Sequence, residues 1–198
     1  MKKVREPTYS FVLLTLGLIV IDIILARLSV VALPASASGI PVIGVSVMYV
    51  AVAFMILFTL WFGAYGAIAA YAGTLVGSGL LASMSPVVAV YWSLAGLLQV
   101  LIPLVAFRTF EADLALENRR DWTILILFGV LINNIVGAAW GAVTLAVGGQ
   151  IPSTEIGSVL FMWLLGNVIV TLVILPIALR RLSPKIIKSK LYVKYYWD

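Results

Sequence analysis

Long apolar stretches alternate with short polar ones along this chain of 198 residues. A helix needs about 20 consecutive apolar residues to cross ~30 Å of hydrocarbon. Six stretches meet this length, and prolines fall in the connections between several of them. Their predicted bounds are 9–33, 42–60, 62–83, 87–107, 122–147 and 157–179. The pattern therefore predicts an all-α integral membrane protein, a bundle of six transmembrane helices.

The same pattern predicts one membrane domain and a tail. We expect residues 1–182 to form the six-helix transmembrane domain. Residues 183–198 mix lysines with three tyrosines and a tryptophan. Cations beside aromatic rings are typical of a segment that lies at the membrane interface. We therefore expect a basic, aromatic tail at the cytoplasmic surface.

Positive charge is confined to three zones. Twelve of the 13 lysines and arginines fall near the two termini or in the connection 108–121. They are Lys2, Lys3, Arg5, Arg108, Arg119, Arg120, Arg180, Arg181, Lys185, Lys188, Lys190 and Lys194. The three opposite connections contain Glu155 as their only charge. Because basic loops stay on the cytoplasmic side, both termini are expected in the cytoplasm of a multi-pass cell (plasma) membrane protein.

The amino-acid composition argues against several classes of function. Hydrophobic residues make up 63% of the chain and charged residues 11%, and histidine and cysteine are both absent. The net charge of +5 fits anionic lipid headgroups rather than nucleic acid, since the cations flank apolar helices. Without histidine or cysteine, no catalytic constellation or metal site emerges. We expect a protein that is not an enzyme and needs no metal or cofactor.

Isolated polar residues interrupt four of the predicted spans at similar depth. Buried polar groups in membranes are costly and usually face the bundle interior, where transporter binding sites lie. Counting along the helices places these residues near the midplane. The candidate substrate-binding residues are Asp22, Gln99, Asn133, Asn134 and Asn167. The alternative is that they bond to one another and only hold the helices together.

Aromatic residues lie in the outer halves of three predicted spans. Trp92, Trp140 and Trp163 are candidates for lining a pocket above the polar layer. Such a pocket would suit flat heteroaromatic or amine-bearing ligands through stacking or cation–π contact. The alternative is an interfacial aromatic belt without a binding role.

Small residues are concentrated in the third span. Ala69, Gly73 and Gly77 recur every four residues and therefore share one helix face. Such a face lets another helix approach closely. It serves either tight packing inside the bundle or docking against a separate membrane subunit, for which these three residues are the candidates.

A family resemblance rests on one stretch and on the overall pattern. The stretch reads Leu60-Trp-Phe-Gly-Ala-Tyr-Gly-Ala-Ile-Ala-Ala-Tyr-Ala-Gly-Thr-Leu-Val-Gly77. It resembles the helix-turn-helix region of the substrate-capturing S components of energy-coupling-factor transporters, which share the expected six spans. The resemblance implies uptake of a vitamin-like or other small nutrient. It also implies a membrane coupling subunit and cytoplasmic ATPases as partners.

A second resemblance rests on other residues. The stretch 97–108, together with Trp163-Leu-Leu-Gly-Asn167 and Pro176, is similar to membrane-associated sensor domains of signalling proteins. Asn167 stands where those domains usually have an acidic residue. The favoured hypothesis is a subunit that binds a small molecule for uptake. A sensory module that signals through a partner and a structural subunit of a larger membrane complex are the alternatives.

Overall fold

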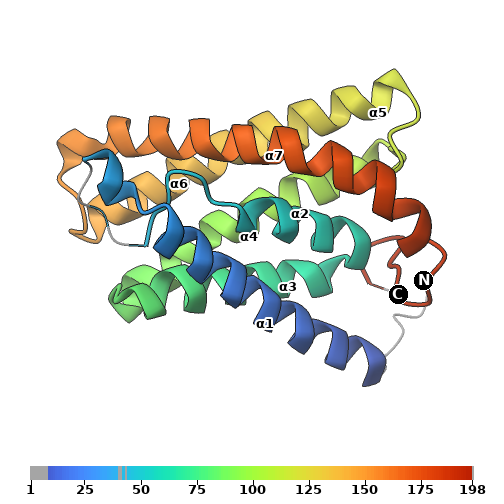
Figure 1. Ribbon diagram of the computed structural model, residues 1–198, viewed down its shortest axis with the longest axis horizontal. Coiled ribbons are helices and arrows are strands. Elements are labelled where there is room, and N and C mark those ends of the chain that lie inside the picture. The colour runs from blue at the N-terminus through green and yellow to red at the C-terminus, as the bar shows by residue number, and fades with distance from the viewer. Residues whose placement is uncertain (1–8, 40–41, 43, 198) are drawn as a thin grey trace.

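The computed structural model describes residues 9–39, 42 and 44–197, so Lys2, Lys3, Arg5 and Pro41 lie outside it. Helices follow one another along the chain and pack side by side in one bundle (Figure 1). The principal helices are α1 (Tyr9–Ala32), α2 (Ala51–Phe62), α3 (Ala64–Gly73), α4 (Pro86–Thr109), α5 (Arg119–Ile124), α6 (Asn133–Val147) and α7 (Ile156–Ile186). The described ranges contain no strand, only an isolated bridge between Pro34 and Ser46.

Two helices continue through π-helical turns. The turn η2 (Thr74–Gly79) and a short 3-10 turn, η3 (Leu80–Ala82), extend α3, and η4 (Leu125–Ile132) joins α5 to α6. With these extensions, five helices of the described chain are long and apolar enough to cross a membrane. They are Tyr9–Ala32, Ala64–Ala82, Pro86–Thr109, Arg119–Val147 and Ser153–Ile186. The chain is therefore an all-α, multi-pass membrane protein.

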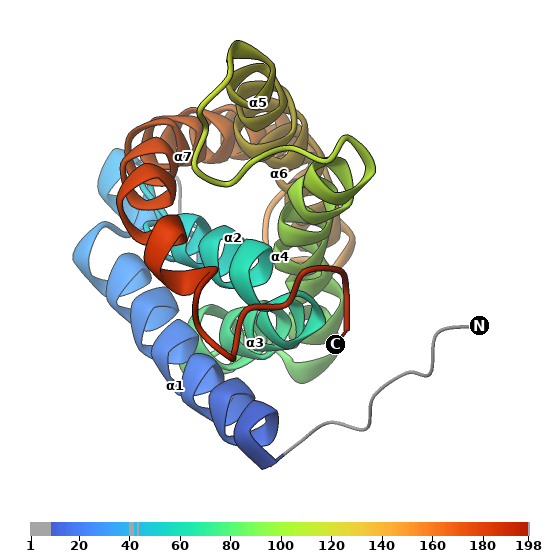
Figure 2. The same ribbon diagram turned by 90° about the vertical axis from the view of Figure 1, so that its right-hand side faces the viewer.

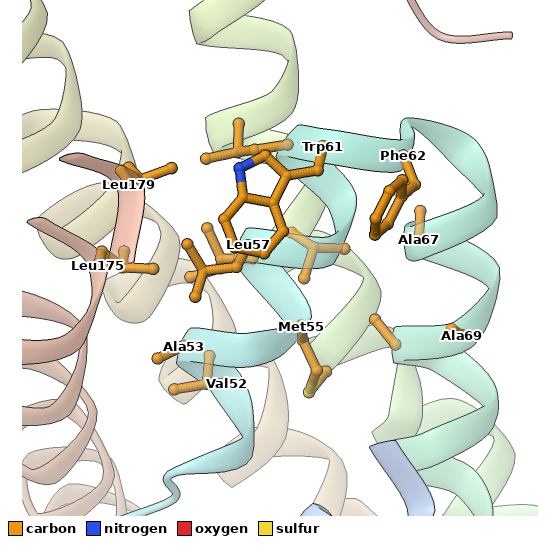
Figure 3. Packing of buried hydrophobic residues seen from close by; sticks show 14 of the residues in the cluster. Val52, Ala53, Met55, Leu57, Trp61, Phe62, Ala67, Ala69, Leu175 and Leu179 are labelled. Carbon is orange, nitrogen blue, oxygen red and sulfur yellow. The ribbon is translucent and has the colours of Figure 1, made fainter. Parts of the chain in front are cut away.

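The short helix α2 lies in the middle of the bundle. Ten of its 12 residues are buried, and it packs against α1, α3, α4 and α7 (Figure 2). Figure 3 shows Leu57 and Trp61 of α2 between Leu175 and Leu179 of α7 and the small residues of α3. Its sequence is apolar on every side, as expected for a helix enclosed by others.

The predicted second span, 42–60, is wrong over its first half. The helix begins only at Ala51, and the described residues before it form an irregular segment. Gly44 has a φ of 76°, outside the helical region. Val42 and Val45 are nevertheless buried against the bundle. A loop that is buried in this way has the apolar composition of a membrane-spanning helix, which explains why the sequence predicted a helix here.

The small-residue face of the third span packs inside the chain. A Cβ added at Gly73 would lie 2.5 Å from the Cβ of Asp22, and one at Gly77 would lie 2.6 Å from the carbonyl oxygen of Ile23. Ala69 is fully buried as well. The face thus lets α1 approach α3 and η2 closely, and α1 covers it.

The tail folds back across the bundle after α7, which continues to Ile186 and so includes the first residues of the segment 183–198. Figure 2 shows the tail crossing the end where α2 turns into α3. The Val193 N–H donates to the Trp61 carbonyl (3.0 Å), and the Ala64 N–H donates to the Tyr196 carbonyl (2.9 Å). The tail therefore pairs with backbone groups that the ends of α2 and α3 leave free.

Arg108, at the end of α4, stabilises the contact of the tail with α2. Its guanidinium donates to the carbonyls of Leu60 (2.9 Å), Val193 (2.8 Å) and Tyr195 (3.0 Å). We call these four residues the Arg108 clasp. Because it joins α4, α2 and the tail, the clasp ties three distant segments together at one end of the bundle.

Candidate functional site

Three helices are joined at one level by polar side chains. The Gln99 amide of α4 donates to Asn134 Oδ1 of α6 (2.8 Å). The Asn134 amide donates to Thr171 Oγ1 of α7 (3.1 Å), and that hydroxyl donates to the Asn167 carbonyl (2.7 Å). All four residues are buried. The structure thus brings Gln99, Asn134 and Thr171 together in one network across α4, α6 and α7, in which Asn167 takes part only through its backbone carbonyl.

A small cavity lies beside this network. Its volume is about 10 Å³, which is about the space of one water molecule. The segment before α2, the junction of α3 and η2, α4 and α7 all contribute to its wall. The lining residues are Gly44, Val45, Ser46, Tyr49, Thr74, Trp92, Gly96, Gln99 and Trp163. Three of the predicted residues, Trp92, Gln99 and Trp163, therefore face one cavity.

Glycines make room for the side chains of the site. A Cβ at Gly137 would collide with Gln99, and one at Gly141 would collide with the Trp163 ring. A Cβ at Gly96 would lie 2.5 Å from Thr74 Oγ1. The close approach of α4 to α6, and of both to the cavity side chains, depends on these missing methyl groups.

The two cavity tryptophans pack against each other. The ring centroids of Trp92 and Trp163 are 5.6 Å apart, and the rings are tilted by 58°. Both indole N–H groups are buried, and neither has a hydrogen-bond partner among the described residues. A buried donor without a partner typically costs about 1–3 kcal/mol, so the site holds unused hydrogen-bonding capacity.

Two buried asparagines outside the cavity wall also have polar atoms without partners. Neither the nitrogen nor the oxygen of the Asn133 side chain is bonded within the described structure, and Asn167 Nδ2 is also unbonded there. Asn133 directly follows the π-helical turn η4, and Thr74 and Ser78 lie in η2. Turns of this kind are frequent at functional sites because they rotate side chains relative to a regular helix.

The irregular segment 44–50 covers the cavity. Ser46 Oγ contacts the carbonyls of Ser29 (2.9 Å) and Leu33 (2.8 Å), which fixes the segment to the end of α1. The Tyr49 hydroxyl lies 3.3 Å from Ser78 Oγ. A Cβ at Gly166 would collide with the Val47 carbonyl, so the segment also lies directly on α7. Two backbone hydrogen bonds, from the Ala35 N–H to the Val45 carbonyl (3.0 Å) and from the Val47 N–H to the Leu33 carbonyl (2.9 Å), also hold the segment, although no regular helix or strand forms it.

Asp22 is buried but lies outside the cavity wall. It faces Gly73 at the contact of α1 with α3. Neither carboxyl oxygen is bonded to any residue that the structure describes. This sequence-based candidate therefore lies at the contact of α1 with α3 and is not one of the residues that line the cavity.

Trp140 lies on the outer surface. It is 40% exposed, and its indole N–H donates to the Tyr91 carbonyl (2.8 Å). It lines an apolar groove between α4 and α6 that faces away from the bundle axis. The structure thus separates Trp140 from Trp92 and Trp163.

Several site residues were missed from the sequence. Ser46 and Tyr49 lie in the stretch that was predicted as a helix, and Thr74, Ser78 and Thr171 were passed over because single hydroxyls are common in membrane helices. The sequence Gly39-Ile-Pro-Val-Ile-Gly44 could have indicated that the helix does not begin here, because glycine and proline are typical of irregular segments.

The described residues contain no cluster of acidic side chains that would hold a metal ion. No protein-family model, curated protein or solved structure matches this chain. The arrangement brings two buried tryptophans, a polar network and an irregular segment together around one small cavity.

Proposed function

We propose that this chain is a membrane subunit that binds a small molecule from outside the cell and takes part in its uptake. One observation carries the proposal: Trp92 and Trp163, whose buried indole N–H groups have no partner among the described residues, line a small cavity beneath an irregular segment. Natural cores rarely leave such donors unsatisfied without a reason, and ligand recognition is one such reason.

The position of the cavity fits capture from the outer side. Trp92 lies about 9 Å and Trp163 about 11 Å along their helices from the ends opposite the Arg108 clasp. The basic residues 108, 119 and 120 lie at or near the clasp end of α4 and α5. By the positive-inside rule we assign the clasp end to the cytoplasm and the cavity end to the outside.

On this assignment, six crossings place both termini in the cytoplasm. The sixth is α2 together with the segment before it. A helix of 12 residues is about 18 Å long, and α2 and this segment are enclosed by the longer helices. Non-helical backbone is tolerated at membrane depth where protein surrounds it.

Energy for uptake would come from other subunits, which we propose to be a membrane coupling subunit and cytoplasmic ATPases. The small-residue face of the third span is covered by α1, so another surface must contact the coupling subunit. Copurification from the native membrane tests this part. ATPases among the bound proteins would support it, and their consistent absence from intact complexes would contradict it.

The binding proposal is tested by native mass spectrometry of the purified protein. We expect one retained small molecule per chain in the wild type. Gly96→Val places a larger side chain against Thr74 in the cavity wall, so this variant should lose the compound. Gly17→Val is the matched control, since nothing lies within 4 Å of the added Cβ there, and it should retain the compound.

Retention by Gly96→Val as well as by Gly17→Val would contradict binding in this cavity. Both proteins must first give a single folded species in size-exclusion chromatography. A wild type that never retains a small molecule, from any growth condition or lysate, would contradict the function.

A sensory module is the second candidate, and one observation favours it. The buried helix α2 begins beside Tyr49 of the cavity wall and ends in the Arg108 clasp with the tail. A displacement of segment 44–50 would therefore be passed through α2 to the cytoplasmic tail. A signalling enzyme that copurifies in place of ATPases would favour this candidate.

A further inference from the structure

Arg27 is the one lysine or arginine of this chain that lies outside the three basic zones. The helix α1 begins at the clasp end, where Phe11 stacks on Tyr65 with 4.7 Å between the ring centroids. Arg27 is five residues before the other end of α1, at Ala32, or about 8 Å along the helix (Figure 1). Because membrane proteins usually carry few cations at the outer end of their helices, the position of this arginine calls for a physical reason.

The guanidinium of Arg27 has no partner within the described part of the chain. Its side chain is half-buried, and none of its N–H groups donates to a described residue. Asp22, the carboxylate nearest to it in sequence, faces Gly73 instead, and both of its oxygens are unbonded there. A guanidinium beside apolar helices carries five N–H donors, so it needs acceptors that come from outside the described residues.

The Arg27 side chain lines an open hollow of about 520 Å³. This volume falls within the usual range of sites for small molecules. Val42 and Leu81 supply apolar surface to the wall, and the hydroxyls of Ser36 and Ser83 add two groups that can donate hydrogen bonds. None of the lining residues that the structure describes is acidic. The hollow therefore offers positive charge and donors beside apolar side chains, without an internal anion.

The hollow adjoins the small cavity of the candidate site. Gly44 and Val45 contribute to the walls of both. A molecule held in the hollow would therefore contact the same irregular segment that covers the cavity. On the orientation assigned above, the hollow also faces the outside of the cell.

We propose that this hollow binds an anionic group, a carboxylate or a phosphate, through the Arg27 guanidinium. The planar guanidinium donates two parallel hydrogen bonds to either group, and the apolar wall accommodates the part of the molecule next to the charge. A soluble molecule and a lipid headgroup share this chemistry. The proposal rests on the proposed function for the role of the anion in uptake, since it makes the captured molecule anionic.

Two probes of matched shape test the need for charge. Benzoate and benzamide have similar shapes, and only benzoate is an anion. Equilibrium dialysis of the full chain in dodecyl maltoside micelles measures both, and empty micelles are subtracted. We expect saturable binding of benzoate and at least about tenfold weaker binding of benzamide, because hydrogen bonds between charged groups are the stronger ones.

Three variants assign the binding to Arg27. Arg27→Gln removes the charge and should weaken benzoate binding at least about tenfold while benzamide binding stays the same. Arg27→Lys keeps the charge and loses the planar fork, so it should restore most of the binding. Arg180→Gln removes an exposed cation near the other end of the bundle and should change neither probe. All three must give a single folded species in size-exclusion chromatography.

Lipids added to the micelles distinguish the two sources of the anion. Displacement of benzoate by phosphatidylglycerol, and not by phosphatidylcholine at the same concentration, would assign the hollow to an anionic headgroup. Retention of benzoate against both lipids would assign it to a soluble anion. Either result supports anion binding at Arg27.

Benzamide binding as tight as that of benzoate, unchanged benzoate binding in Arg27→Gln, or no saturable benzoate binding by the folded wild type would overturn the proposal. Native mass spectrometry distinguishes this failure from failure of the function. A retained uncharged compound that is lost from Gly96→Val would refute the anionic class and leave the binding function standing. Benzoate binding that depends on Arg27, in a protein that never retains a compound, would support the anion site and refute the function.

Discussion

At the scale of single residues, hydroxyl groups and glycines determine how the side chains of the site pack. Thr171 is small, but it accepts from Asn134 and donates to the Asn167 carbonyl, so it joins α6 to α7. Gly141 has no side chain, yet the position of the Trp163 ring depends on that absence. Asp22, the single carboxylate of the predicted spans, packs outside the cavity wall.

Thr171→Val should lower the free energy of unfolding by about 1 kcal/mol. The substitution keeps the shape of the side chain and removes its hydroxyl, which leaves Asn134 without one buried partner. Thr144→Val makes the same change where the hydroxyl only bonds to the backbone of its own helix, so it should be nearly neutral. Denaturation in mixed micelles measures both, and equal effects would refute a special role for Thr171.

Gly141→Ala should destabilise the protein by about 1–3 kcal/mol, because the added methyl group would overlap the Trp163 ring. The same denaturation assay measures this variant. In Gly157→Ala the methyl group meets nothing within 4 Å, so this control should be neutral or slightly stabilising. Tryptophan fluorescence should shift only in the first variant. An unchanged spectrum and stability for Gly141→Ala would show that the contact of α6 with Trp163 is looser than described.

At the scale of elements, α2 connects the two ends of the molecule. Its first N–H groups lie beside Ser29 and the cover, and its last carbonyls bond to Arg108 and the tail. The cover and the tail are therefore the elements most directly affected by any displacement of α2.

Arg108→Ala should free the tail from the ends of α2 and α3. Loss of the bonds to three carbonyls is expected to raise the hydrogen-exchange rate of the Val193 amide about 10- to 100-fold. Arg119→Ala is the matched control, since Arg119 is exposed at the start of α5. Hydrogen exchange read by mass spectrometry measures both, and unchanged protection of residues 191–197 in Arg108→Ala would mean that the tail is held by other contacts.

At the scale of the whole molecule, charge separates the two ends of the bundle. The clasp, the exposed Arg120 and the tail cations lie toward one end, and the connection with Glu155 lies at the other. Because cations beside apolar helices usually remain on the cytoplasmic side, this asymmetry predicts that the clasp end faces the cytoplasm.

Cysteine labelling tests the orientation without background, since the chain has no cysteine. Ala115→Cys and Ser189→Cys should react with an impermeant maleimide only after the cells are opened. Ser153→Cys, in the connection before α7, should react on intact cells. Labelling of positions 115 and 189 from opposite sides would mean that the chain crosses the membrane an odd number of times between them.

The membrane-spanning helices could be predicted from the sequence wherever a stretch is both long enough and apolar enough to cross a bilayer. The bounds of α1, of α4 and of the helices at 64–82 and 119–147 lie within three residues of prediction. The prediction of a helix over the segment before α2 was wrong, because a buried segment that contains Val42 and Val45 has the same apolar composition as a membrane-spanning helix. The extension of α7 to Ile186 was missed because its basic residues suggested the end of a span, although a helix need not end at the membrane surface.

By itself, the sequence determined that this protein is a membrane-embedded bundle of helices with a few polar groups at membrane depth. The cost of an unpaired peptide group or charge in hydrocarbon acts on each segment separately, so it can be read locally. Only the tertiary structure decided which side chains share the cavity. Lipid is as apolar as leucine, so hydrophobicity does not show which face of a membrane helix turns inward. That choice came from contacts between distant residues, such as Gly141 with the inward-facing Trp163 and the outward-facing Trp140 with the Tyr91 carbonyl.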